Sequence, residues 1–238
     1  MYLVVGTVSV LTGIVWHAWT LLILVLVPEG IALSIGNTAS LIGLQLALVA
    51  LVSCIEPSLR GLAGGMLFLA AIAAGLTGSE PGMTAAESMT WQLRLHILTS
   101  LFAYGLLAVG AIVALYALIQ EKRLHAGMLS SINRLFAPLE TTEKLLFGIT
   151  TTGFFALVVA VSTGFAFVDN LFAQHLVHKT ALSLLALILF GLLLIGRRFG
   201  GWRGKRAVYL YLWGFVFLCL AYFGSRFVLE EILGRSWS

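Results

Sequence analysis

The chain has 238 residues, of which 60% are hydrophobic and only 10% are charged, and its formal net charge is +4. A soluble globular domain carries roughly 25% charged residues, so this composition excludes an ordinary water-soluble protein. The basic residues flank apolar segments, where Lys and Arg ordinarily set the orientation of membrane helices. The net positive charge is therefore no sign of a nucleic-acid partner.

Seven uncharged, apolar runs separated by short polar joints make up most of the chain. An apolar run of about 18 residues or more can cross a lipid bilayer as a helix, and in hydrocarbon a helix satisfies its backbone within one segment. The sequence therefore predicts an all-α, polytopic integral membrane helical bundle of about seven transmembrane helices, in a single membrane domain over residues 1–238. The runs cover residues 1–28, 30–55, 61–79, 95–120, 145–168, 180–196 and 207–225.

The basic residues predict which side of the membrane each joint faces. The joints after the second, fourth and sixth runs share one side and hold ten of the fourteen Lys and Arg residues. Cytoplasmic loops carry such an excess, so in a bacterial inner membrane we expect the N-terminus inside and the C-terminus outside. On the cytoplasmic side, residues 128–136 are expected to lie along the interface, and the glycine-rich joint 200–206 is expected to anchor the chain to the inner leaflet.

His96, near the start of the fourth run, is the first candidate for a functional side chain. An ionisable residue in a membrane helix is costly and is a functional candidate by default. The predicted topology puts His96 at the outer end of its helix. Two interpretations remain open: a neutral imidazole that only satisfies a hydrogen bond, and an axial ligand to haem, for which histidine is the usual protein ligand.

Two more histidines, His175 and His178, precede the sixth run on the same outer side. Their spacing would place them on one face of a helix. A pair of histidines without an acidic third ligand is weak evidence for zinc. The other interpretations are a solvated polar loop and haem ligation by His178.

His17 lies inside the first run, and it is interpreted as a packed polar residue, a second haem ligand or part of a proton path. His125 falls in the basic cytoplasmic joint and is expected to be solvated. In the same joint, Glu140 follows Pro138 and predicts that a helix begins there. No acidic residue lies inside any run, which argues against an ion-coupled transporter.

Four sequence blocks resemble the cytochrome c assembly superfamily, and most closely its HemX/YpjD-like branch. The blocks follow the family order within residues 90–232, while residues 1–80 match more loosely, mainly through His17 and Ala18. The resemblance implies a membrane bundle, usually of eight helices, that binds or moves haem, with an external haem ligand at His96. The blocks are LRLHILTSLFAY at 93–104, LETTEK at 139–144, GWRGKR at 201–206 and LAYFGSR at 220–226.

The chain departs from the cytochrome c synthase branch of that superfamily. The synthase branch carries a WGxxWxWD segment before the helix that resembles the sixth run, whereas residues 167–178 contain no tryptophan. It also has histidines where residues 195–197 and 226–232 have none. We therefore expect no enzyme activity, and we predict an accessory haem-binding protein. Its candidate cofactor ligands are His96, His178 and His17, and its predicted ligands to the haem iron are His96 and His178.

The main alternative is a haem-free structural or regulatory membrane protein, in which the histidines only satisfy hydrogen bonds. Other membrane or haem-pathway proteins would be its partners, docked on the cytoplasmic loops. A membrane electron-transfer protein is a weaker interpretation, because the inner half of the bundle offers only His125 as a ligand. Close helix contacts are expected to use small residues. Examples are Gly105, Gly110, Gly164 and Gly214.

Overall fold

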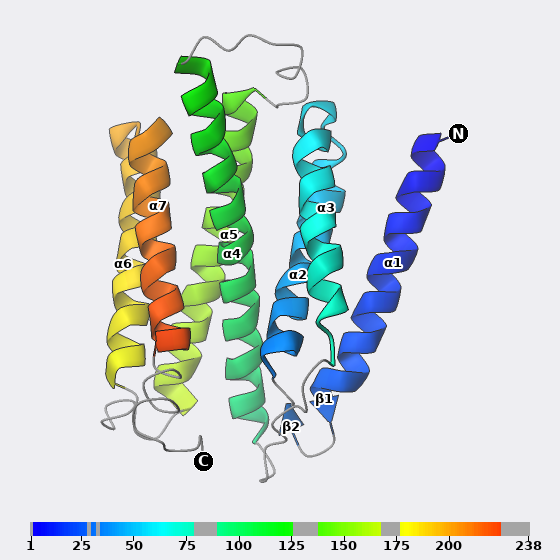
Figure 1. The fold of residues 1–238 in the computed structure, drawn as a ribbon. Coiled ribbons are helices and arrows are strands. Elements are labelled where there is room, and N and C mark those ends of the chain that lie inside the picture. The colour runs from blue at the N-terminus through cyan, green and yellow to red at the C-terminus, as the bar shows by residue number, and fades with distance from the viewer. Residues whose placement is uncertain are drawn as a thin grey trace. The chain divides into compact units, whose positions relative to one another are not determined.

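The computed structural model describes residues 2–27, 30–31, 34–78, 90–125, 138–167 and 177–224. These residues contain seven helical segments that are long and apolar enough to cross a membrane (Figure 1). The predicted all-α, polytopic membrane architecture is therefore confirmed. The helices are α1 (Tyr2–Val25), α2 (Ile35–Ser53), α3 (Arg60–Gly75), α4 (Trp91–His125), α5 (Leu139–Phe167), α6 (Val177–Gly200) and α7 (Gly204–Cys219).

Four short elements lie between or after the helices. The strands β1 (Leu26–Val27) and β2 (Gly30–Ile31) pair antiparallel. The sequence predicted instead that these residues belong to the first two transmembrane helices. Pro28 accounts for the change, because proline disfavours helical conformation in the residue before it. The 3-10 helix η1 (Pro57–Leu59) leads into α3, and the π-helical turn η3 (Leu220–Gly224) follows α7.

Several helices continue through charged residues beyond their apolar runs, and α4 and α5 do so most clearly. With 35 residues, α4 is about 52 Å long, which exceeds the roughly 30 Å hydrocarbon core of a bilayer. It continues through Glu121 and Lys122 because such residues are good helix formers. It ends at His125, which is helical where a loop was predicted. The start of α5 after Pro138, with Glu140 in its first turn, is confirmed.

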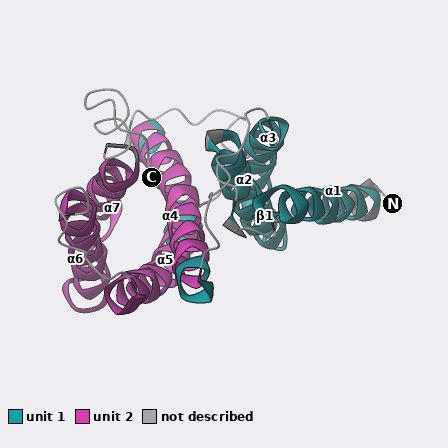
Figure 2. Cartoon of the chain, turned by 90° about the horizontal axis from the view of Figure 1, so that it is seen from below, with its two compact units in different colours: residues 1–94, 123–144 teal, residues 95–122, 145–238 magenta. Residues whose placement is uncertain are grey.

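The described chain forms two compact units, which Figure 2 shows in teal and magenta. Unit 1 comprises Met1–Arg94 and Arg123–Lys144, and unit 2 comprises Leu95–Lys122 and Leu145–Ser238. This division does not test the expectation of a single membrane domain, which stays a prediction. The amphipathic stretch 128–136 and His175 lie outside the described residues.

In unit 1, α2 packs closely against α3 through small residues. A Cβ atom added at Gly43 would lie 2.6 Å from Ala73 Cβ and 3.3 Å from the Ala70 carbonyl oxygen. The missing side chain therefore lets the two backbones approach, as is common between membrane helices. The residues Leu21 and Val25 of α1 are buried, at 2% and 3% exposure, and mark the face of α1 that packs against this pair.

In unit 2, the helices α4, α5, α6 and α7 follow one another around a four-helix arrangement (Figure 2). A contact joins each helix to the next one along the chain, and a contact between α7 and α4 closes the arrangement. The contacts are Leu107 with Gly153, Phe154 with Gly191, Phe190 with Tyr211, and Tyr211 with Leu107.

Tyr211 is the largest fully buried side chain of unit 2 and ties α7 to two neighbours. Its hydroxyl donates a hydrogen bond to the Leu107 carbonyl oxygen at 2.7 Å. Its ring meets that of Phe190 edge-to-face, with centroids 5.1 Å apart. Gly110 leaves room for the Tyr211 ring, and Gly214 leaves room for the Phe190 ring. The predicted small-residue contacts at these two glycines are confirmed.

Candidate functional site

His96 lies in the second turn of α4 and faces the interior of unit 2. It precedes Ala103 by seven residues and Leu107 by eleven, and this spacing puts all three on one face of the helix. Ala103 and Leu107 are fully buried. The face of α4 that packs inside unit 2 therefore carries the imidazole into contact with α5.

The hydrogen bonds around His96 determine which of its ring nitrogens carries the proton. Its Nδ1 lies 3.2 Å from Thr163 Oγ1 on α5. The Thr163 hydroxyl donates its single proton to the Ala160 carbonyl oxygen at 2.9 Å. It can therefore only accept from His96, so a neutral imidazole holds its proton on Nδ1. In that tautomer Nε2 carries the lone pair. The ring also makes a hydrogen bond to the backbone of Ala160, the residue whose carbonyl accepts from Thr163.

A glycine on α5 provides the surface against which the His96 ring lies. A Cβ added at Gly164 would come within 3.0 Å of His96 Cε1 and 3.5 Å of Nδ1. The predicted small-residue contact at Gly164 is thereby confirmed, with a ring as its partner. Thr163 and Gly164 together hold the ring from one side.

This arrangement fits an axial haem ligand. A metal-binding histidine usually donates its other ring N–H to a protein acceptor, which fixes the tautomer and the ring orientation. Thr163 supplies that acceptor for His96, and the unprotonated Nε2 is the atom that would bind iron. Sequence reasoning missed Thr163. The available signal was the polar Ser162 and Thr163, which interrupt an otherwise apolar run just before Gly164.

His178 is the second residue of α6 and is exposed. The helix begins three residues earlier than the apolar run at 180, so His178 is helical. No hydrogen bond or ring contact between His96 and His178 occurs in the described part of the chain. Pairing of these two histidines on one iron stays a prediction. The described residues also contain no group of three or more His, Cys, Asp or Glu that could hold a metal ion without a porphyrin.

His17 belongs to unit 1 and takes part in a hydrogen-bonded chain that joins α1, α2 and the turn after α3. It precedes the buried Leu21 and Val25 by four and eight residues and therefore shares their face of α1. Its Nε2 lies 2.6 Å from Ser40 Oγ on α2. Ser40 Oγ lies 2.5 Å from Thr77 Oγ1, in the turn after α3.

The direction of this chain follows from its last member. Thr77 donates to the Ala74 carbonyl oxygen at 2.7 Å, so it accepts from Ser40, and Ser40 in turn accepts from His17. In a neutral His17 the proton is therefore on Nε2, and Nδ1 is the nitrogen left for any further ligand. Ser40 is completely buried. Neither Ser40 nor Thr77 was predicted from the sequence as a partner of His17.

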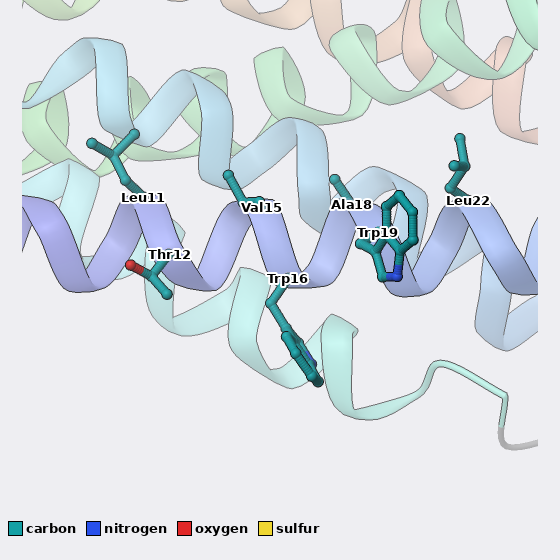
Figure 3. Close-up of a pocket in the computed structure, with 7 residues that line it drawn as sticks. All are labelled: Leu11, Thr12, Val15, Trp16, Ala18, Trp19 and Leu22. Atoms are coloured by element: carbon teal, nitrogen blue, oxygen red, sulfur yellow. The ribbon is translucent and has the colours of Figure 1, made fainter.

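A hollow runs along the opposite surface of α1 (Figure 3). All seven of its lining residues belong to α1, and they include Trp16 and Trp19, which are 75% and 61% exposed. His17 is not among them. Thr12 is the one polar residue among those that line the hollow, so this surface of α1 is almost entirely apolar.

Comparison with known proteins connects the chain to one family. The family model of the cytochrome C assembly protein matches residues 4–233. The chain is similar to the inner membrane protein YpjD of Escherichia coli K12, with 37% identity over 137 residues, or 58% of this chain and 52% of YpjD. It is also 30% identical over 159 residues to an uncharacterized 28.8 kDa protein of Azospirillum brasilense, covering 66% of this chain and 56% of that protein.

These alignments span about half the length of the curated relatives. No solved structure is significantly similar to the chain. The family match nevertheless extends over nearly all of the sequence, beyond the four blocks that carried the resemblance. It agrees with the seven membrane-capable helices. The chain is an integral membrane protein that belongs to the cytochrome c assembly protein family.

Proposed function

We propose that this protein binds and handles haem as an accessory membrane protein of cytochrome c assembly, without synthase activity. The observation that carries the proposal is the geometry at His96. Its Nδ1 lies at hydrogen-bond distance from Thr163 on α5, and the Ala160 backbone gives the ring a second hydrogen-bond partner on the same helix. With the proton on Nδ1, Nε2 carries the lone pair that a ligand to iron needs. The family relationship supplies the context of haem handling.

The proposed role of the chain is to bind and orient the cofactor. Bound haem would supply an iron atom with axial positions open to protein ligands. His96 would occupy one position through Nε2, with Thr163 holding the ring by its Nδ1–H and Gly164 giving it room. The protein thus contributes ligation and an apolar environment, and we assign it no bond-forming chemistry of its own.

We propose His178 as the second axial ligand. It lies in the first turn of α6, and His96 lies in the second turn of α4. The start of α4 and the start of α6 are on the same side of the membrane, because two spans lie between them in the alternation of helices. His17 is a further candidate, and the hydrogen bond from its Nε2 to Ser40 leaves only Nδ1 for that role.

The proposed setting is a bacterial inner membrane, as in the relative YpjD. The distribution of Lys and Arg supports an N-terminus inside, a C-terminus outside and His96 near the outer face. The cytoplasmic joints are then the proposed docking surfaces for partner proteins of the haem pathway.

Absorption spectra of the protein purified in mild detergent test this proposal. We expect a Soret band and a sharp reduced α-band in the oxidised and dithionite-reduced protein, and we expect His96→Ala to lose them. His125→Ala, the same substitution at the far end of α4, is the matched control and should keep both bands. An unchanged spectrum in His96→Ala, or no Soret band in the wild type even after haem is added, would refute the proposal.

A further inference from the structure

The turn between α6 and α7 has a defined conformation set by two glycines and a tryptophan. Gly201 and Gly204 have φ of +62° and +61°, a backbone conformation that other residues rarely adopt. The Trp202 backbone N–H donates to the Gly196 carbonyl oxygen at 3.1 Å. The Trp202 ring lies against Gly196 and Gly200, where an added Cβ would collide with it. The tryptophan therefore closes the turn by packing back onto α6.

One arginine of this segment is used to hold the turn in place. Arg197 lies with its guanidinium 4.5 Å from the centre of the Phe147 ring on α5. Its Nη1 also donates to the Trp202 carbonyl oxygen at 3.3 Å. Arg197 is half-buried. Its charge is thus engaged within unit 2, which separates it from the other basic residues of the turn.

Four other basic residues of the turn are exposed, namely Arg198, Arg203, Lys205 and Arg206. Lys205 Nζ lies 4.0 Å from Glu121 Oε1 on α4, so the nearby acid offsets one of these charges. The three arginines leave the cluster with a surplus of positive charge.

An exposed aromatic residue lies beside these arginines. Phe199 is 82% exposed, the highest value among the large hydrophobic side chains of the described chain. The Arg198 guanidinium lies 5.8 Å from its ring centre. An exposed aromatic ring next to exposed cations is the combination expected of a surface that contacts both the acyl boundary and the headgroups of a membrane.

We propose that the α6–α7 turn is a binding site for the phosphate of an anionic phospholipid headgroup. The turn joins two membrane-spanning helices, so it lies at the level of the headgroups. The guanidinium group matches phosphate geometry and can donate two parallel hydrogen bonds to it. Arg198, Arg203 and Arg206 are the proposed phosphate ligands, and Phe199 is the proposed contact with the acyl chains. This inference is independent of haem binding.

The test is a titration of the full-length protein in neutral detergent with fluorescently labelled phosphatidylglycerol, followed by anisotropy. Wild-type protein should bind it more tightly than labelled phosphatidylcholine. Each Lys or Arg near an anionic membrane contributes about 1 kcal/mol, or roughly a fivefold factor in affinity. The combined variant Arg198→Gln, Arg203→Gln and Arg206→Gln should therefore bind phosphatidylglycerol about a hundredfold more weakly.

A matched variant controls for the loss of three charges. Arg60→Gln, Lys122→Gln and Arg123→Gln remove three exposed cations at the ends of α3 and α4, and this variant should keep the preference for phosphatidylglycerol. Equal binding of the two lipids to wild type, or equal weakening in both triple variants, would overturn the proposal. Full displacement by an equal concentration of inorganic phosphate would also overturn it, because the site would then recognise free phosphate.

A measurement on the wild type decides the question if the turn variant fails to fold. Binding that depends on exposed charges is screened by salt. Wild-type affinity for phosphatidylglycerol should therefore fall as the salt concentration rises, while that for phosphatidylcholine should not. Salt-independent binding of phosphatidylglycerol would contradict a site made by Arg198, Arg203 and Arg206.

Discussion

The substitution Thr163→Val tests whether the hydrogen bond to His96 prepares that residue for haem. Valine has nearly the shape of threonine, so the half-buried packing between α4 and α5 is largely kept, while the acceptor for His96 Nδ1–H is removed. The ring then loses the side-chain partner of Nδ1 and keeps the hydrogen bond to the Ala160 backbone. Gly164 offers the ring a surface and no polar partner, so the orientation of the ring then depends on one hydrogen bond in place of two.

The expected size of the effect follows from the kind of contact that is lost. A single intramolecular hydrogen bond contributes about 1 kcal/mol to stability, so the protein should still fold. Loss of the partner of a metal-binding histidine typically lowers metal affinity about 10- to 100-fold. We therefore expect Thr163→Val to weaken haem binding by a factor in that range while leaving the unfolding midpoint within a few degrees of wild type.

The assay is a titration of haem-free protein with haemin, followed by the Soret band. Thr151→Val is the matched control, because Thr151 lies on the same helix, is exposed and bonds only to the Phe147 carbonyl of that helix. The control should bind haem like wild type. Equal affinity in Thr163→Val and wild type, or an equal loss in both variants, would refute the assignment of Thr163 as a positioning residue.

Two further predictions rest on the glycine beside His96 and on the buried serine of unit 1. Gly164→Ala should weaken haem binding, because the added Cβ would lie 3.0 Å from the ring of His96. Gly148→Ala should not, because no atom lies within 4 Å of the added Cβ. Equal haem affinities of the two variants would contradict this prediction. Ser40→Ala should lower the free energy of unfolding by about 1–3 kcal/mol, because it removes the hydrogen-bond acceptor of the half-buried His17. The measurement is thermal unfolding in detergent. The control Ser9→Ala should change stability much less, because the exposed Ser9 hydroxyl bonds to its own helix. An equal shift of the unfolding midpoint in the two variants would contradict the prediction.

The sequence by itself determined the class of protein and the number of membrane helices. Both depend on local quantities, since a helix must be long and apolar enough to cross hydrocarbon wherever its neighbours lie. It also located the start of α5, because a proline followed by an acidic residue is a local signal. The extension of α4 to His125 was missed, because an apolar run ends at its first charged residue while a helix can continue through such residues.

Only the tertiary structure decided which partners the histidines have. The oxygen atoms of Thr163 and Ser40 belong to residues 67 and 23 positions away from His96 and His17. Helices such as α1 and α4 are apolar on most sides, so their periodicity does not predict which face meets a neighbour. Packing between helices chose those faces through close contacts at glycines such as Gly164. The tautomers of His96 and His17, and with them the nitrogen available to a ligand, therefore depend on how the helices pack.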